Sequence, residues 1–538
     1  MSDEPPSASA EGKSGDSASA EGKVELRRDV TVWGSFMWGY ADVGADIYTA
    51  LGLVMAAAQG ATSLAFGLAG LVYIMIGLGY TELASAYPVA GGGQYFALRG
   101  LGDFWGYVAG AALLLDYTID IALFSVASAG YLNFFWKYVF GHPYASTPIH
   151  LMWGLTIEDP ILAGEALALI GFLIWLNIRG MKESSLFNEL LGGIDIATES
   201  SIIIFGFVFA WKPELLAKQW HDTFAHFSLH DFAYGSSLAI ISFVGLESIS
   251  QAAQETRRPA TIIPRTSVTL IFTVFIFAMA FSTLGLGVLP WQAFRDNIND
   301  PVALLAHNIP FIGFIAGPFA AFLGLTILAI SANSGIMSAS RLTFSMSQLR
   351  LVTPWFDKVH PKYRTPSRTI IFFSLIGALQ VALGAFTKQI LDTLGNMYAF
   401  GATLGYILVF ISLIKLRFDD PYTPRPYRVP INVPWKRKDG TVVSVPILGI
   451  IGMLGVSTIF FEVVYTHAIG RIAGPSWVIA ALVYYYFFRK SQKLPFFKSL
   501  PRDWEKEQVE VLKSAEEYDL LEQYKNALAA RDKRKNAT

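Results

Sequence analysis

The sequence predicts an all-α, multi-spanning membrane protein with about twelve transmembrane helices. The chain of 538 residues is 53% hydrophobic and only 15% charged, with a mean hydropathy of +0.43. These values are too apolar for a water-soluble protein of this size. Its apolar runs are about 20 residues or longer, which is the length that a helix needs to cross ~30 Å of hydrocarbon. The two ends of the chain are polar by contrast.

The predicted elements fall into three consecutive parts. Segment 1–27 is small, polar and Pro-rich and lacks the apolar core of a signal peptide, so we expect a disordered cytoplasmic tail. Segment 28–490 is the transmembrane domain, and segment 491–538 is charged and helix-favouring, which predicts a solvated helical tail in the cytoplasm. The spans are expected at residues 31–57, 63–87, 103–135, 161–178, 186–211, 232–253, 266–289, 312–346, 367–387, 390–416, 445–466 and 470–489.

Basic residues in alternate loops predict the orientation. Lys and Arg precede the first span at Arg27 and Arg28 and recur in loops around residues 179–182, 257–265, 358–368 and 417–438. The intervening loops are poorer in Lys and Arg, so both termini are expected in the cytoplasm, with the protein in the plasma (cell inner) membrane.

Composition and motifs exclude several classes of function. A net charge of −1 gives no basic excess for nucleic acid, and the absence of Cys removes disulfides and thiolate chemistry. The sequence contains no Walker A motif, no nucleophile elbow and no HExxH, so we expect neither an enzyme nor ATP-driven transport, and no cofactor or metal site. A secondary transporter, a channel and a membrane sensor remain. No repeated pore loop and no large soluble output domain is visible, which favours the transporter.

Two of the predicted spans carry polar interruptions at corresponding places. In the first span, the stretch YADVGADIY has Asp42 and Asp46 on either side of Gly44, where we expect the helix to break. In the sixth span, Gly245 and Glu247 interrupt the apolar face. Paired broken helices in the first and sixth positions are typical of transporters built from inverted repeats, with the binding site at the bilayer midplane.

Further acids lie inside the third and fifth spans. Asp116 and Asp120 are four residues apart and share a helix face, as do Asp195 and Glu199. If all seven acids of these four spans were charged and unpaired, they would cost roughly 20 kcal/mol, at about 2.5 to 3.5 kcal/mol each. No Lys or Arg lies deep in a span, so protons, metal cations or a cationic substrate must neutralise these acids.

Some of these residues also have structural interpretations. Asp46 could instead cap the second half-helix, and Asp120 could pair with a hydroxyl of a neighbouring helix. Glu199 lies closer to the outer half and could line a vestibule. Glu82, at the cytoplasmic end of the second span, is expected to pair with a basic loop residue and to help close the inner gate.

Several stretches resemble the amino acid, polyamine and organocation (APC) permease superfamily. They are NIRGMKESSLFN, FVGLESISQAAQETRRPATIIPR, ANSGIMSASRLTFSMSQLRLVTPWFDKVHPKYRTPSR, RPYRVPINVP and YTELASAYPVAGGGQYFALRGLG, and the similarity covers most of residues 28–490. The resemblance implies a LeuT-like, five-plus-five inverted-repeat fold with two accessory helices at the end. It also implies secondary active transport by alternating access.

The acids of the first span depart from the glycine-rich break of many amino acid carriers in the superfamily. They are more similar to the potassium-uptake permeases of the KUP and KimA kinds, although the large cytosolic domain of the KimA kind is missing. Carried over, that resemblance implies a substrate site of Asp42, Tyr48, Asp116, Tyr117 and Glu247.

The position of the coupling ion follows from the fifth span. Proton-coupled carriers of the superfamily have a lysine in the region that holds Asp195 here, so Asp195 is expected to carry the coupling proton, with Asp120 as a second candidate. Alternatively, Asp195 could bind sodium together with Ser331 and Ser334.

These expectations combine into one hypothesis, a proton-coupled permease for a small cationic solute such as a cationic amino acid or an amine. Its partners are the solute, the proton or sodium ion and the lipid bilayer. Potassium import is the alternative, and a neutral amino acid permease is a weaker one.

Overall fold

The computed structural model describes residues 32–537, apart from residues 90, 143–145, 152–153, 180–181, 252, 254–255, 257 and 438–440. Within this part of the chain, ten helical stretches are long and apolar enough to cross a membrane. The first stretch, Val32–Ala86, has 55 residues and would extend about 80 Å as a single straight helix. It turns at η2 (Gln59–Ala61) and therefore provides two crossings. The protein is all-α and multi-pass, as predicted, and the expected tail 1–27 lies outside the described residues.

The long helices follow the predicted order. They are α1 (Val32–Val43) with α2 (Ile47–Ala58), α3 (Thr62–Ala86), α5 (Asp103–Phe140), α6 (Pro160–Arg179), α7 (Lys182–Phe205) with the π-turn η4 (Gly206–Ala210), α9 (Leu229–Ala239) with α10 (Glu247–Gln251), α11 (Pro259–Val288), α14 (Gly313–Gln348), α15 (Ser367–Gly384), α16 (Ile390–Asp419) and α17 (Ile447–Thr466). The expected twelfth span corresponds to α18 (Gly470–Ser491). This helix is long enough to cross a membrane, but it is not among the ten most apolar stretches, and charged residues lie near both of its ends.

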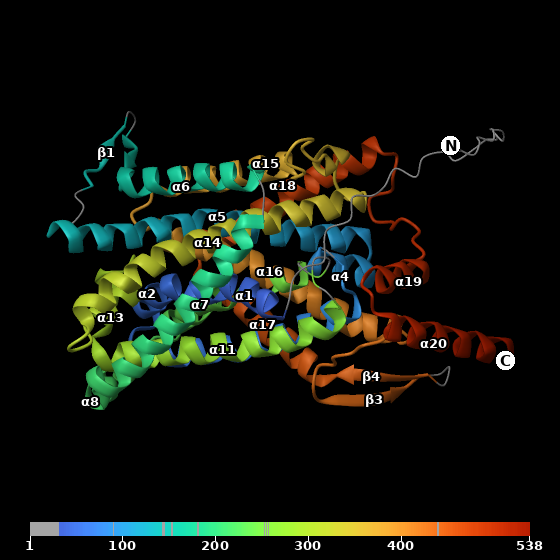
Figure 1. The fold of residues 1–538 in the computed structure, drawn as a ribbon, viewed down its shortest axis with the longest axis horizontal. Coiled ribbons are helices and arrows are strands. Elements are labelled where there is room, and N and C mark those ends of the chain that lie inside the picture. The colour runs from blue at the N-terminus through green and yellow to red at the C-terminus, as the bar shows by residue number, and fades with distance from the viewer. Residues whose placement is uncertain are drawn as a thin grey trace, which may run out of the picture.

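Short elements gather at the two ends of the bundle (Figure 1). At one end lie the antiparallel hairpin of β1 (Ile149–His150) and β2 (Thr156–Ile157), with α8 (Pro213–Ala225), α12 (Trp291–Asp296) and α13 (Pro301–His307). At the other end lie α4 (Gly92–Leu101), the antiparallel hairpin of β3 (Asn432–Lys436) and β4 (Val442–Pro446), α19 (Trp504–Ser514) and α20 (Tyr518–Ala537). The second end contains loops that the basic residues predict to be cytoplasmic. The sidedness itself stays a prediction.

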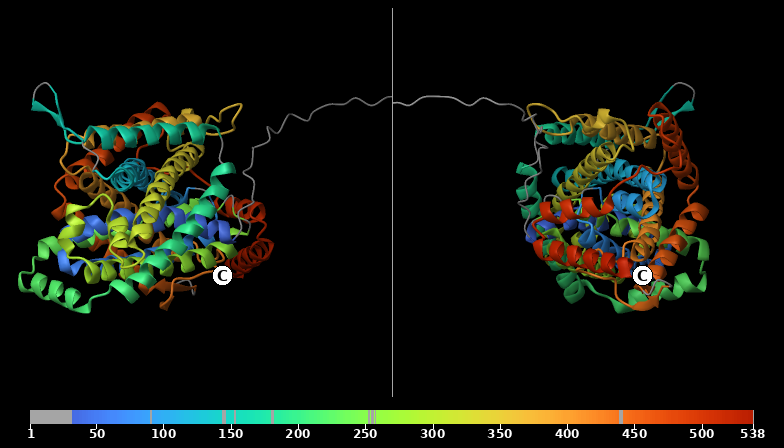
Figure 2. Two further views of the ribbon diagram at one scale, coloured as in Figure 1. Left: turned by 60° about the vertical axis from the view of Figure 1, so that its left-hand side comes forward. Right: turned by 90° about the vertical axis from the view of Figure 1, so that its right-hand side faces the viewer.

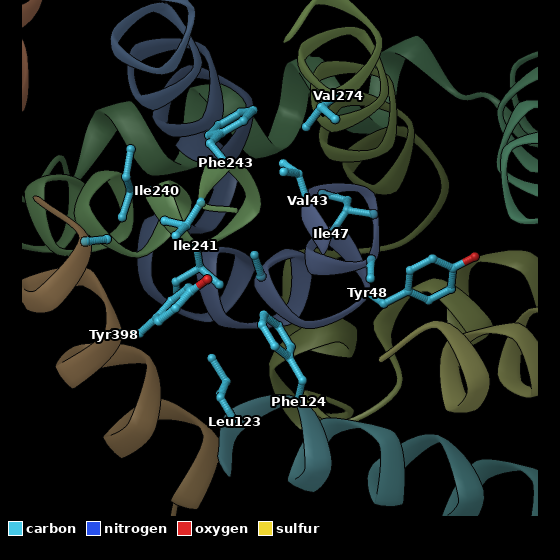
Figure 3. Packing of buried hydrophobic residues seen from close by; sticks show 14 of the residues in the cluster. Val43, Ile47, Tyr48, Leu123, Phe124, Ile240, Ile241, Phe243, Val274 and Tyr398 are labelled. Carbon is cyan, nitrogen blue, oxygen red and sulfur yellow. The ribbon is translucent and has the colours of Figure 1, made fainter. Parts of the chain in front are cut away.

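The interior of the bundle is built around the first, third and tenth spans. Helix α5 packs along α14 and α16, α3 packs against α11, and α2 packs against α9. Figure 3 shows apolar side chains of α5, η5 (Ile240–Phe243), α11 and α16 converging on the broken first span, with Phe124 and Val274 among them. This arrangement keeps the first span out of contact with lipid along most of its length, and polar groups placed on it face other helices.

The two predicted helix breaks differ in kind. The first span tightens into a single 3-10 turn, η1 (Gly44–Asp46), and the flanking residues keep right-handed helical angles. The sixth span is fully interrupted after η5, because Val244 is extended and Gly245 has a φ of +110°. A Cβ atom at Gly245 would also lie only 2.9 Å from Oδ2 of Asp42. Glycine is therefore required at Gly245 both by its conformation and by the approach of the first span.

The C-terminal segment differs from the solvated tail that the sequence predicts. It is helical as expected, but α19 and α20 lie against the end of the bundle that contains α4 (Figure 2). Arg99 of α4 donates to Gln508 at 3.0 Å, and Gln508 donates to the Ala86 carbonyl at 2.9 Å. Arg258, before α11, pairs with Glu517 at 3.7 Å. The charge pattern of the segment could not predict these contacts, because the partner residues lie far away in the sequence.

Candidate functional site

Five predicted acids come together in the middle of the bundle. We call them the central acidic cluster: Asp42 of α1, Asp46 of η1, Asp116 and Asp120 of α5, and Glu247 of α10. All are buried, and they lie close enough to repel one another when ionised. Among the ion pairs that the described residues form, none includes a member of this cluster. Acidic side chains are thus concentrated here without a fixed counter-charge in the part of the chain that the structure describes.

Asp116 and Glu247 form an interacting pair within the cluster. Their carboxyls lie beside each other. When both are ionised they can only accept hydrogen bonds, and neither oxygen of Asp116 has a donor among the described residues. One shared proton would turn this repulsion into a hydrogen bond. The Tyr406 hydroxyl of α16 donates to Oε2 of Glu247 at 3.0 Å and so fixes the position of the pair.

Hydroxyls of α14 face the acids of the first span. Ser331 Oγ lies 3.3 Å from the Asp42 carbonyl and 3.5 Å from Oδ1 of Asp46. Ser334 lies near the Asp42 carboxyl. Asp46 occupies the N-cap position of α2, but its side chain makes no capping hydrogen bond, which argues against a capping role. Oδ2 of Asp46 has no partner among the described residues, so it can accept from a ligand.

The backbone N–H groups at the break in the sixth span lie beside an acid. Interrupted helices expose backbone N–H groups that can hold an anionic part of a substrate. Here the N–H groups of Gly245 and Glu247 lie next to the Glu247 carboxyl. The Ser248 N–H donates to the Gly245 carbonyl at 3.0 Å. The first span does not unwind, so a substrate carboxylate would have to use N–H groups that lie beside the Glu247 carboxyl.

Tyrosines surround the central acidic cluster. Tyr117, predicted from the sequence, is buried and interacts electrostatically with Glu247, Asp116 and Asp42. Sequence reasoning did not identify Tyr73, Tyr80, Tyr398 and Tyr406, which also interact with these acids. Their sequence signal is weak, because an aromatic residue in an apolar span is most often a packing residue.

A second polar group lies apart from the central acidic cluster. The Tyr48 hydroxyl donates to Oδ1 of Asp195 at 2.7 Å, and the Tyr40 hydroxyl donates to Oε2 of Glu199. The expectation that Tyr48 lines the substrate site with Asp42 is therefore not met in this structure. We call Tyr40, Tyr48, Asp195 and Glu199 the tyrosine–acid cluster.

The two candidates for proton coupling also separate. Asp195 belongs to the tyrosine–acid cluster, whereas Asp120 lies with the central acids near Tyr398. The alternative sodium site of Asp195 with Ser331 is not formed, because Ser331 faces Asp42 and Asp46. Across the described residues, no group of three or more His, Asp or Glu side chains is arranged to hold a metal ion.

Glu82 has the partner type that the sequence predicted. Its carboxylate is fully buried and binds the Arg417 guanidinium through two hydrogen bonds of 2.5 Å, from Nε and from one terminal nitrogen. The Val429 N–H donates to it at 2.8 Å, and Arg425 Nε lies 3.4 Å away. This buried ion pair connects α3 to the end of α16 and to the loop that follows.

Comparisons with known proteins agree with the architecture. A family model described as an amino acid permease matches residues 31–488. A branched-chain amino acid permease of Bacillus subtilis is 25% identical over 488 residues, 89% of this chain and 96% of its own length. A methylthioribose transporter of the same organism is 27% identical and covers 72% of this chain and 80% of its own length.

A cationic amino acid transporter of Mus musculus, number 4 of its group, is 26% identical over 71% of this chain and 58% of its own length. These comparisons give no support to the suggested likeness to potassium-uptake permeases, which stays a prediction. The relatives are transporters rather than enzymes, and the chain itself is a multi-pass permease for a small molecule. The chain belongs to the amino acid permease family, within the APC superfamily.

Proposed function

We propose that this permease couples the movement of protons to the uptake of a small cationic solute, an amine or a cationic amino acid. One observation carries the proposal, namely that five mutually repelling carboxyls are buried between α1, α5 and α10 and form no ion pair with a basic side chain among the described residues. Fully ionised, they would cost on the order of 15 kcal/mol at mid-membrane depth. A positively charged cargo removes part of this cost, whereas a free carboxylate adds to it.

The site residues take separate roles in this proposal. Asp42, Asp116 and Glu247 receive the cationic group of the solute, with Tyr117 beside them. When the cargo arrives, its positive charge replaces the proton shared by Asp116 and Glu247, and that proton returns to the water on the side from which the cargo entered. Asp195, tied to Tyr48, and Asp120 are the candidates for carrying the coupling proton. Relatives in mouse, human and Arabidopsis thaliana are named as cationic amino acid transporters, which supports a cationic cargo.

Potassium is the second candidate cargo. It is favoured by the Glu247 carboxyl beside the N–H groups at the break in the sixth span, because an amino acid needs such donors for its own carboxylate and a metal ion does not. The same observation favours a simple amine over a cationic amino acid. A neutral amino acid fits least well, since it brings a carboxylate next to the acids and no net positive charge.

Uptake into proteoliposomes tests the proposal. Vesicles with an imposed inward proton gradient are supplied with labelled arginine, putrescine, leucine or rubidium, the last as a tracer for potassium. We expect uptake of at least one cationic probe, competition by the others, and loss of that uptake in D42N and in E247Q. Transport of leucine alone, unaffected by D42N, would refute the cationic cargo. Rubidium uptake without arginine or putrescine uptake would select the second candidate.

A further inference from the structure

The tyrosine–acid cluster connects the first span to α7 on both sides of the 3-10 turn. Tyr40 precedes η1 and Tyr48 follows it, and each donates to an acid of α7. The two acids, Asp195 and Glu199, are one helical turn apart, so a single face of α7 binds both halves of the first span. The Tyr40 ring also lies across Gly44, because a Cβ atom there would come within 2.7 Å of it.

A small cavity opens beside this cluster. Glu199, Tyr40 and Gly44 line it on one side, and Ser242 of η5 lines it on another. Val274 of α11 contributes to its apolar wall. Its volume has room for about one water-sized occupant, which is too small for an amine or an amino acid. The cavity thus lies between the interruptions of the first and the sixth spans.

Two buried polar atoms face this cavity without a partner among the described residues. They are Oε1 of Glu199, in a side chain that is 0% exposed, and the hydroxyl of Ser242, which is 1% exposed. Oδ2 of Asp195 is likewise without a partner. Buried polar atoms in native proteins nearly always have a hydrogen-bond partner, and an exception calls for an occupant such as an ion or a water molecule.

The charges around Glu199 define the occupant. The groups that face it are Asp195 on its own helix, Tyr40 of α1, Tyr48 of α2 and Tyr131 of α5. Two neighbouring carboxyls surrounded by neutral tyrosines attract a positive charge. The cavity is too small for an organic cation, which leaves a monovalent inorganic cation.

We propose that this cavity binds one small monovalent cation, a hydrated proton or sodium, that Glu199 holds it, and that the neighbouring Asp195 adds to the negative charge that attracts it. The inference deepens the proposed function by separating the coupling ion from the cargo, and it rests on that function only for the transport assay. Occupancy of the site controls the first span directly. The ion draws negative charge away from the carboxylates that accept from Tyr40 and Tyr48, so binding weakens the hydrogen bonds that hold the two halves of that span to α7.

An extension of the network reaches the end of the bundle that contains α13. The Tyr131 hydroxyl donates to the Tyr48 carbonyl at 2.7 Å and accepts from the Val302 N–H of α13 at 3.3 Å. These two hydrogen bonds connect Tyr48 to a short helix at that end of the bundle, and they do not involve the central acidic cluster.

The transport test compares two assays on the same variants. Counterflow of the cationic probe, which needs no coupling ion gradient, measures the central site. Accumulation driven by a proton gradient or by a sodium gradient measures coupling. We expect E199Q to lower driven accumulation by about tenfold, within the usual range for coupling between two sites, and to leave counterflow within about twofold of wild type. If E199Q loses the accumulation driven by the proton gradient, the bound ion is the proton; if it loses the accumulation driven by the sodium gradient, the ion is sodium.

Matched controls separate this role from a structural one. E189Q makes the same substitution at a partly exposed position of α7 and should leave both assays unchanged. Y40F removes the hydrogen bond to Glu199 but keeps both carboxyls. Accumulation should therefore still depend on the ion, with its half-maximum at a different ion concentration. If E199Q accumulates the probe with the ion dependence of the wild type, the inference is overturned.

A second measurement does not require the cargo. The melting temperature of the solubilised protein is followed against sodium concentration and against pH, since a bound ion stabilises the folded state by mass action. We expect an ion-dependent increase in wild type and in D42N, and its loss in E199Q. Absence of any such increase in wild type also counts against the site. Absence of counterflow by wild type counts against the proposed function alone, so the two failures are distinguishable.

Discussion

Substitution of Glu82 by Gln is the sharpest test of the packing that closes one end of this permease. The Glu82 carboxylate is 0% exposed and binds Arg417, whose side chain is 3% exposed. E82Q preserves the size of the side chain but leaves the Arg417 guanidinium buried without its counter-charge. Removing one partner of a buried ion pair costs about 3 to 5 kcal/mol. We therefore expect a clear fall in the melting temperature of the solubilised protein.

Two further variants make the test quantitative. E505Q breaks another Glu–Arg pair, to Arg531, at a position where the Glu505 side chain is 50% exposed, and exposed pairs contribute only about 0 to 1 kcal/mol. The double variant E82Q/R417Q removes both charges and should recover part of the stability that E82Q loses. The measurement is thermal unfolding in detergent for all three variants. If E82Q shifts the transition no more than E505Q does, the pair does not hold this end together.

Three other predictions follow from the described contacts. Y48F removes the donor to the buried Asp195 and should destabilise the protein by about 1 to 3 kcal/mol, measured by thermal unfolding, whereas the reasoning fails if its melting curve matches wild type. Deletion of 501–538 uncovers the Arg99 side chain and should increase cleavage of the adjoining loops in limited proteolysis; an unchanged digestion pattern would contradict the docking. Burial opposes the charged form of Asp420, but Arg99 and other neighbours outweigh it and hold the pKa of Asp420 below its usual range. Its contribution to stability is therefore present above the unfolded-state pKa and lost as the pH falls through the lower folded-state pKa. Wild type should exceed D420N in stability at neutral pH and converge with it in acid, whereas parallel curves at all pH values would refute the assignment.

The sequence predicts the buried acids of the bundle better than their partners. A carboxylate in a 20-residue apolar run is conspicuous because its burial is costly, and Asp42, Asp116 and Glu247 are buried as this signal predicts; their role in binding stays a prediction. Helix geometry alone also places Asp195 and Glu199 on one face. These inferences need only local information, which a single sequence contains.

The placement of the tyrosines depends on tertiary structure. Tyr48 follows Asp42 by six residues, so at about 100° per residue the two side chains point in directions that differ by about 120°. A regular helix therefore does not place both side chains on the same face of the first span, as the predicted substrate site requires. Tyr406 lies more than 150 residues from Glu247, and nothing local to either residue predicts their contact.

The predicted break of the first span was correct in position and overstated in extent. Gly44 marks the site, but a single 3-10 turn suffices because the Tyr40 ring packs against the glycine and supports the backbone there. In the sixth span, Gly245 adopts a positive φ, and the interruption is complete. Glycine content alone does not distinguish these outcomes, because the difference comes from the side chains that fill the space beside each glycine.

The docked C-terminal helices extend past residue 488, where the match to the amino acid permease family ends. Through Gln508 they hold α3 and α4, and through Glu517 they hold Arg258, which precedes the seventh span. These anchor points belong to segments that lie on different parts of the bundle, so they keep their spacing only while that end keeps its shape. The emission of a fluorophore on α20 should consequently change when that end of the bundle opens, although the label itself lies outside the transport path.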